Sequence, residues 1–112
     1  MPGVKVVHWW AFANCRALTD VECDTLEIIG QGAFSVCDSL RSINLPSARI
    51  FEDGWVFEGC TALTDVRFGN KLERIEACSF LYCTSLERIT IPLKDGIITE
   101  DDIRRVWKFQ TR

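Results

Sequence analysis

Apolar residues recur along this chain at a fixed spacing. A phenylalanine returns every 22 or 23 residues, and it is followed at steps of three by a cysteine, a leucine and a branched aliphatic residue, with another apolar residue two positions later. The five columns are Phe12, Phe34, Phe57 and Phe80; Cys15, Cys37, Cys60 and Cys83; Leu18, Leu40, Leu63 and Leu86; Val21, Ile43, Val66 and Ile89; and Cys23, Leu45, Phe68 and Ile91. Self-similarity at this period is the signature of a repeat architecture.

Each repeat predicts one coil of a solenoid. Its final part alternates, with Ile43 and Leu45 inward and Asn44 outward, which is typical of a short strand with one buried face. Pro46 and Pro92 follow two of these strands, where proline ends the ladder. One coil alone leaves its apolar edges exposed, whereas stacked coils share a continuous core. We therefore predict a repeat array over residues 1–98, with coils near 7–28, 29–51, 52–74 and 75–97.

Two stretches carry a resemblance to a known family. Residues 29–40 (IGQGAFSVCDSL) and 79–92 (SFLYCTSLERITIP) resemble BspA-type leucine-rich repeats, and the resemblance extends over about residues 7–93. It implies a right-handed leucine-rich-repeat solenoid with a short parallel β-sheet on the concave face and turns or short helical pieces on the convex face. It also implies binding of a protein or another ligand, without catalysis.

The chain departs from this pattern at two places. The third repeat has Glu52–Phe57 where the motif prefers Ile-Gly-x-x-Ala-Phe, and its apolar partners Ile50 and Phe51 come early, which predicts a local bulge. Asp24 stands after Cys23 where proline is usual, so the sequence does not predict the path of the chain after this strand.

The C-terminal segment predicts a capping helix over residues 99–112. Thr99 is a good N-cap, and three acidic residues follow it, where the helix dipole favours negative charge. Ile103, Val106 and Trp107 form an i, i+3, i+4 apolar face. We expect this helix to cover the last coil; binding to a partner is the alternative.

At the other end, the chain begins within a coil. Val4 and Val7 match the columns of Leu26 and Ile29, and no polar cap precedes them. Terminal repeats normally need a polar outer face. The N-terminal edge is therefore expected to be uncovered, so the chain is either part of a longer array or is covered there by another molecule.

Composition excludes several classes of function. The net charge of −3 and the pI of about 5.1 argue against nucleic-acid binding. The apolar runs are shorter than the ~20 residues of a membrane span. With His8 as the only histidine, no phosphate-binding loop and few groups for acid–base chemistry, we expect no enzyme, no catalytic residues and no cofactor.

Localisation is weakly constrained by the sequence. Residues 6–13 have the apolar character of a signal-peptide core, but they belong to the repeat register. With no signal peptide and cysteines that suit a reducing compartment, the cytoplasm is favoured. The cell surface is the alternative, since members of the resembled family are often exposed there.

The six cysteines predict packed thiols. Four of them share one column, and Cys23 takes a strand position that apolar residues fill in the other repeats. Successive coils would place these cysteines about 5 Å apart, within reach of a disulfide, so oxidation is the alternative. Zinc is least favoured, because no Cys-x-x-Cys pair occurs, and we expect no metal site.

Two sets of residues are candidates for binding. The outward strand positions form one set: Asp20, Ser42, Asp65 and Arg88 on one side of the inward column, and Glu22, Asn44, Arg67 and Thr90 on the other. Trp10 and Trp55 form the second set, since they share a column two coils apart. Ordinary solvated or half-buried side chains are the alternative for both.

Two functions remain open on this evidence. The first is a non-catalytic protein-interaction module that presents the concave face to a protein partner of unknown identity. The second is a structural protein, or a fragment of a longer array, that self-associates through its N-terminal coil edge.

Overall fold

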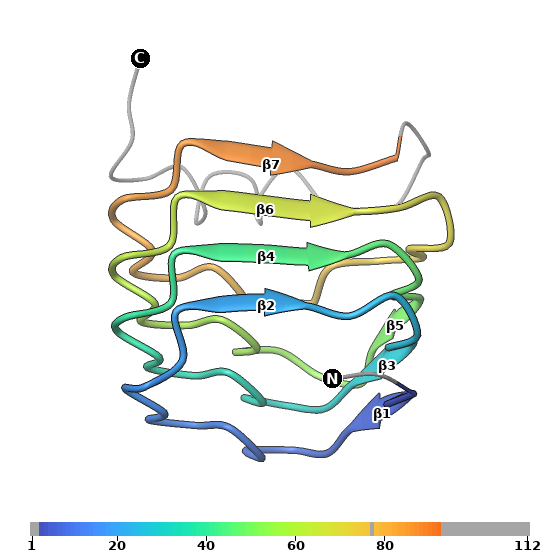
Figure 1. The fold of residues 1–112 in the computed structure, drawn as a ribbon, viewed down its shortest axis with the longest axis horizontal. Helices are drawn as coiled ribbons and strands as arrows, with labels where there is room; N and C mark the ends of the chain where they lie inside the picture. The colour runs from blue at the N-terminus through green and yellow to red at the C-terminus, as the bar shows by residue number, and fades with distance from the viewer. Residues whose placement is uncertain (1–2, 77, 93–112) are drawn as a thin grey trace.

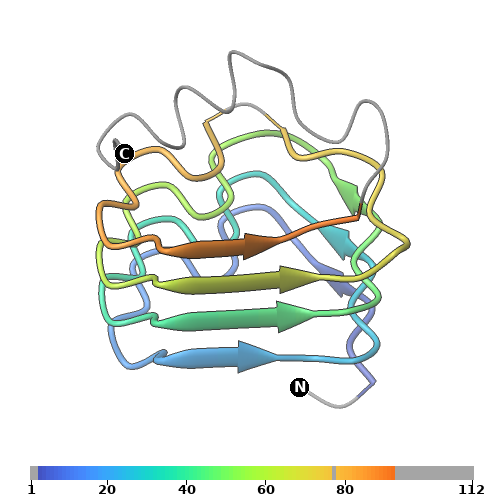
Figure 2. The same ribbon diagram turned by 90° about the horizontal axis from the view of Figure 1, so that it is seen from above.

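A computed structural model describes residues 3–76 and 78–92, which wind through about four coils (Figures 1 and 2). Each coil places short strands at equivalent positions. The strands are β1 (Val6–Val7), β2 (Asp20–Glu22), β3 (Ile28–Ile29), β4 (Ser42–Leu45), β5 (Ile50–Phe51), β6 (Asp65–Phe68) and β7 (Arg88–Thr90). The predicted repeat solenoid is thereby confirmed.

The strands form two parallel sheets on different sides of the solenoid. The larger has the order β2-β4-β6-β7 and the smaller the order β1-β3-β5, which Arg74 extends through a parallel bridge to Ile50. The register follows the sequence columns, so Val21 pairs with Ile43 and Ile43 with Val66. The period-two pattern of each strand thus places one column in the core.

The third side of each coil is a turn centred on the phenylalanine that recurs in every repeat. We name the segments 10–14, 32–36, 55–59 and 78–82 the phenylalanine turns. The residues two positions before and after each phenylalanine adopt left-handed backbone with φ between 55° and 74°. These residues are Trp10, Gly32, Trp55 and Cys78 before it, and Asn14, Val36, Gly59 and Tyr82 after it.

Hydrogen bonds join neighbouring phenylalanine turns in one direction. The backbone N–H of Phe12 donates to the backbone carbonyl of Ala33 in the next coil at 2.8 Å. The N–H groups of Trp10 and Asn14 donate in the same way to the carbonyls of Gln31 and Ser35. The same pattern recurs one coil further along. Of the predicted turns or short helical pieces, the structure has turns, and no helix occurs in residues 3–76 or 78–92.

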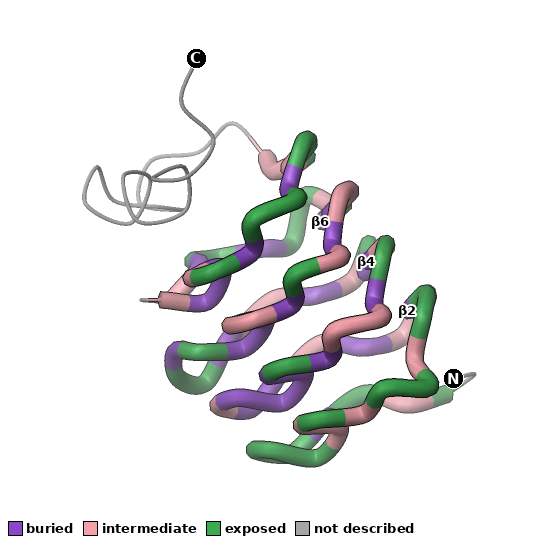
Figure 3. Tube along the Cα trace, turned by 90° about the vertical axis from the view of Figure 1, so that its left-hand side faces the viewer, coloured by how far each residue is buried: buried purple, intermediate pink, exposed green. Residues whose placement is uncertain are grey.

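The core is a set of continuous columns. The rings of Phe12, Phe34, Phe57 and Phe80 stack with centroids 5.4 Å apart and nearly parallel planes. Phe34, Phe57 and Phe80 are fully buried, as is most of the leucine column. Figure 3 shows that buried segments recur at the same places in the inner coils, whereas the coil nearest the N-terminus is mostly exposed.

The irregularity predicted for the third repeat lies at residues 52–54. β5 is not bulged, because Ile50 and Phe51 pair in register with Ile28 and Ile29. The extra residue forms a bend after the strand, and the N–H of Gly32 reaches the carbonyl of Gly54 across it.

Two further expectations concern the ends of the strands and of the chain. The segment that follows β2 and Cys23 is held by Thr25, whose hydroxyl donates to the carbonyl of Val4 at 2.7 Å. The predicted helix over residues 99–112 lies outside the described residues, as does the end of the array at residue 98.

Candidate binding surfaces

The outward side of the four-stranded sheet carries the eight polar residues singled out from the sequence. Val21, Ile43 and Val66 point into the core, so their neighbours on each strand point outward. We name this surface the sheet face. Its two columns are Asp20, Ser42, Asp65 and Arg88, and Glu22, Asn44, Arg67 and Thr90, each aligned by the strand register.

Hydrogen bonds cross between coils on the sheet face. Asp20 accepts a hydrogen bond from the Ser42 hydroxyl at 2.6 Å and from the Arg41 guanidinium at 3.1 Å. The bond from Ser42, and then that from Arg41, lower the pKa of Asp20 below its usual value near 3.8. Asn44 donates to Glu22 at 3.5 Å, so both columns of the first coil are linked to the second.

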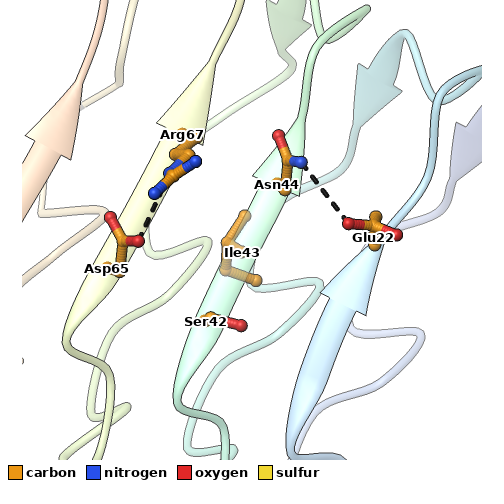
Figure 4. A pocket seen from close by; sticks show the side chains of 6 residues that line it. All are labelled: Glu22, Ser42, Ile43, Asn44, Asp65 and Arg67. Atoms are coloured by element: carbon orange, nitrogen blue, oxygen red, sulfur yellow. Dashed lines mark hydrogen bonds and ion pairs between the residues drawn. The ribbon is translucent and has the colours of Figure 1, made fainter.

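A shallow groove runs between the columns. It has a volume of about 160 Å³ and is lined by Glu22, Ser42, Ile43, Asn44, Asp65 and Arg67 from β2, β4 and β6 (Figure 4). Arg67 pairs with Asp65 of the same strand at 3.3 Å. The groove is polar and mixed in charge, which suits polar contacts with a partner.

Trp10 and Trp55 lie in the phenylalanine turns, about two-fifths exposed each. The ring of Trp10 covers the next coil, since a Cβ added to Gly32 would lie 2.5 Å from two ring carbons. Val36 covers Gly59 in the same manner, with its Cγ2 at 3.2 Å from such a Cβ. Large side chains in these columns therefore pack over glycine in the following coil.

The sequence interpretation missed Val36 and Tyr82, which are also exposed and left-handed. They lie two positions after the phenylalanine, as the tryptophans lie two before it. The sequence shows which residues occupy the positions two before and two after each phenylalanine. It does not show the left-handed backbone that exposes large side chains at both positions.

The cysteine column forms a ladder of thiols. All six cysteines, each within the described residues, are thiols rather than disulfides. Cys37, Cys60 and Cys83 each donate to the carbonyl of the phenylalanine one coil earlier at 3.1 Å. Burial raises the pKa of Cys83 to about 12. The prediction of packed thiols is confirmed, and the thiols of Cys37, Cys60 and Cys83 also bond to the preceding coil.

Residues 3–76 and 78–92 contain no group of three or more His, Cys, Asp or Glu side chains that could hold a metal ion. They also contain no helix with the length and apolar character needed to cross a bilayer.

Among the described residues, no coil covers the N-terminal side of the first coil, and we name this side the open edge. Phe12, Cys15 and Leu18 are only partly buried, although their columns are buried in the inner coils. Gln31, Ala33 and Ser35 accept hydrogen bonds from the preceding coil. Within the described residues, no donor reaches the carbonyls at the equivalent positions of the first coil, Trp9, Ala11 and Ala13.

Comparison with known protein families gives a match over most of the chain. The family model described as the BspA type leucine-rich repeat region matches residues 3–102 in six copies. Neither the curated proteins nor the solved structures include a match.

Proposed function

Because the chain belongs to the BspA-type leucine-rich repeat family, we propose that it is a non-catalytic module that binds a protein partner through its sheet face. One observation carries the proposal. Eight outward side chains from four successive coils form two straight columns, and hydrogen bonds between coils hold several of them in place. Side chains that are already ordered lose less entropy on binding.

The order of charges along the sheet face favours one orientation of a bound partner. The first coil contributes Asp20 and Glu22, whereas the last contributes Arg88. A partner with the opposite order of charges would gain orientation and association rate more than affinity. The face is small, so we expect an interface at the lower end of the standard size range.

The test is a charge reversal on the sheet face. Arg67→Glu should weaken partner recovery in quantitative affinity capture and reduce its salt dependence, without lowering the melting temperature. Arg16→Glu is the matched control, because the Arg16 side chain is 82% exposed and lies outside the sheet face. Equal recovery by both variants, or unfolding of Arg67→Glu, would contradict the proposal.

A second candidate function is self-assembly through the open edge. It is favoured by the three carbonyls that no donor among the described residues reaches, since the equivalent carbonyls of the second and third coils accept from the preceding coil. Ala11 is exposed there, whereas Ala33 in the same column is completely buried beneath the first coil.

Sedimentation across a wide concentration range tests this candidate. A molecular mass that grows with protein concentration would support self-assembly, provided that this growth is abolished by Ala11→Arg and retained by Thr61→Arg. Thr61→Arg is the control, because Thr61 is exposed on the third coil, away from the open edge. A monomer at every concentration would exclude it.

A further inference from the structure

The phenylalanine turns form a second surface, distinct from the sheet face. Six large hydrophobic side chains are exposed among the described residues, and four of them are in these turns: Trp10, Val36, Trp55 and Tyr82. All four adopt left-handed backbone, which is strained for side chains of this size. We name this surface the turn face. Exposed aromatic residues are enriched at protein interfaces.

One charged residue lies within the four phenylalanine turns, and it is Glu58. Its Oε1 accepts a hydrogen bond from the Ser35 hydroxyl of the preceding coil at 2.7 Å. Ser35 is only 3% exposed, so this bond holds the carboxylate against the second coil. No donor among the described residues reaches Oε2 of Glu58, which leaves that oxygen to accept from another molecule.

Glu58 and its partner Ser35 each lie between the two left-handed positions of their turn. Gly59 follows it in sequence and is covered by Val36, while Trp55 precedes it by three positions. The ring of Trp10 lies over Gly32, in the same column as Trp55. Glu58 is therefore a positioned negative charge with large apolar side chains in the columns on either side.

The charged residues just before the third and fourth phenylalanine turns are also acidic. Glu52 and Asp53 are exposed just before Trp55, and Glu76 precedes the last phenylalanine turn. Neither residues 52–63 nor residues 75–86 contain a lysine or an arginine. A neutral or acidic partner would leave the Glu58 carboxylate without a counter-charge in the interface.

We propose that the turn face binds an arginine side chain of a protein partner. The guanidinium donates to Oε2 of Glu58, and its plane lies on the exposed tryptophan of the third coil. A guanidinium fits better than an ammonium group, because it is flat and more weakly hydrated. The turn face is separate from the sheet face, so an experiment can refute binding at one surface without refuting binding at the other.

The experiment uses the isotope-labelled full chain and two short blocked glycine–serine peptides. One carries a central arginine, and the other carries citrulline, which has the same shape without the charge. The arginine peptide should shift the indole N–H signals of Trp10 and Trp55 saturably, with a dissociation constant on the order of 1 mM. The citrulline peptide should bind about tenfold more weakly.

Two variants test the roles of the carboxylate and the ring. Glu58→Gln keeps an acceptor for Ser35 and should lose about tenfold in affinity, whereas Glu87→Gln, an exposed carboxylate next to β7, should bind like the wild type. Trp55→Gly should also lose affinity and should fold, because Gly32 occupies the equivalent left-handed position.

Several results would overturn the proposal. They are wild-type affinity in Glu58→Gln, equal binding of the citrulline peptide, no saturable shift, or shifts confined to the sheet face. Thermal unfolding of each variant separates a loss of binding from a loss of fold.

Discussion

Gly32→Ala is the sharpest test of how neighbouring coils pack on the turn face. Gly32 has φ of +60°, and a Cβ there would lie 2.5 Å from two carbons of the Trp10 ring. The substitution therefore has two separable effects. It places a side chain in left-handed backbone, and it displaces the indole that covers the position.

The two effects have different sizes. Left-handed backbone costs an alanine about 1 kcal/mol relative to glycine. Trp10 is 43% exposed, so displacing its ring re-exposes roughly 100 Å² of apolar surface, worth up to about 2.5 kcal/mol. We expect Gly32→Ala to destabilise the protein by about 3 kcal/mol, but by only about 1 kcal/mol when Trp10→Ala is already present.

Urea unfolding of the four proteins in this cycle measures the coupling, provided that the m-value stays constant. Gly59→Ala is the matched control, because its φ is +74° and the nearest atom to its Cβ would be Cγ2 of Val36 at 3.2 Å. That control should cost about 1 kcal/mol. If the effects of Gly32→Ala and Trp10→Ala add within about 0.5 kcal/mol, the ring does not rest on Gly32 and the packing argument is wrong.

Three further predictions concern the core, the sheet face and the thiols. Phe34→Ala should destabilise by about 4 kcal/mol and Phe12→Ala by clearly less in urea unfolding, because Phe34 is fully buried between two stacked rings. Asp20, whose pKa is lowered, stabilises the fold above pH 3.8 and loses this effect as pH falls through its folded pKa, so Asp20→Asn should flatten the acid limb of a melting-temperature profile. At pH 8, iodoacetamide should alkylate Cys15 well before Cys83, as read by peptide mass spectrometry, since Cys83 is 3% exposed with its pKa raised to about 12; equal rates would contradict the thiol ladder.

The columns of the fold could be predicted because each has one physical requirement. A strand with alternating Ile43, Asn44 and Leu45 buries one face whatever its neighbours are, and parallel stacking then fixes the register. The eight outward residues of the sheet face follow from the same alternation. Their arrangement was therefore readable from the sequence, while their role in binding stays a prediction.

The turn face could not be predicted in the same way. Its shape depends on left-handed backbone at Trp10, Val36 and Trp55, which are residue types that rarely adopt it. The bond between Ser35 and Glu58 joins residues 23 positions apart whose side chains carry no pattern in sequence. Likewise, the packing of a large side chain over a glycine of the next coil becomes evident only when the coils are stacked.

The spacing of contacts has a consequence for how this chain folds. The thiol, hydroxyl and backbone bonds between coils join residues one coil apart, with sequence separations of 22 to 26 for most of the side-chain bonds. Each added coil therefore closes a loop of nearly the same length and meets the same entropic cost. Once two coils have paired, every later coil docks on a finished template, so folding should start with one costly pairing and then propagate along the solenoid in either direction.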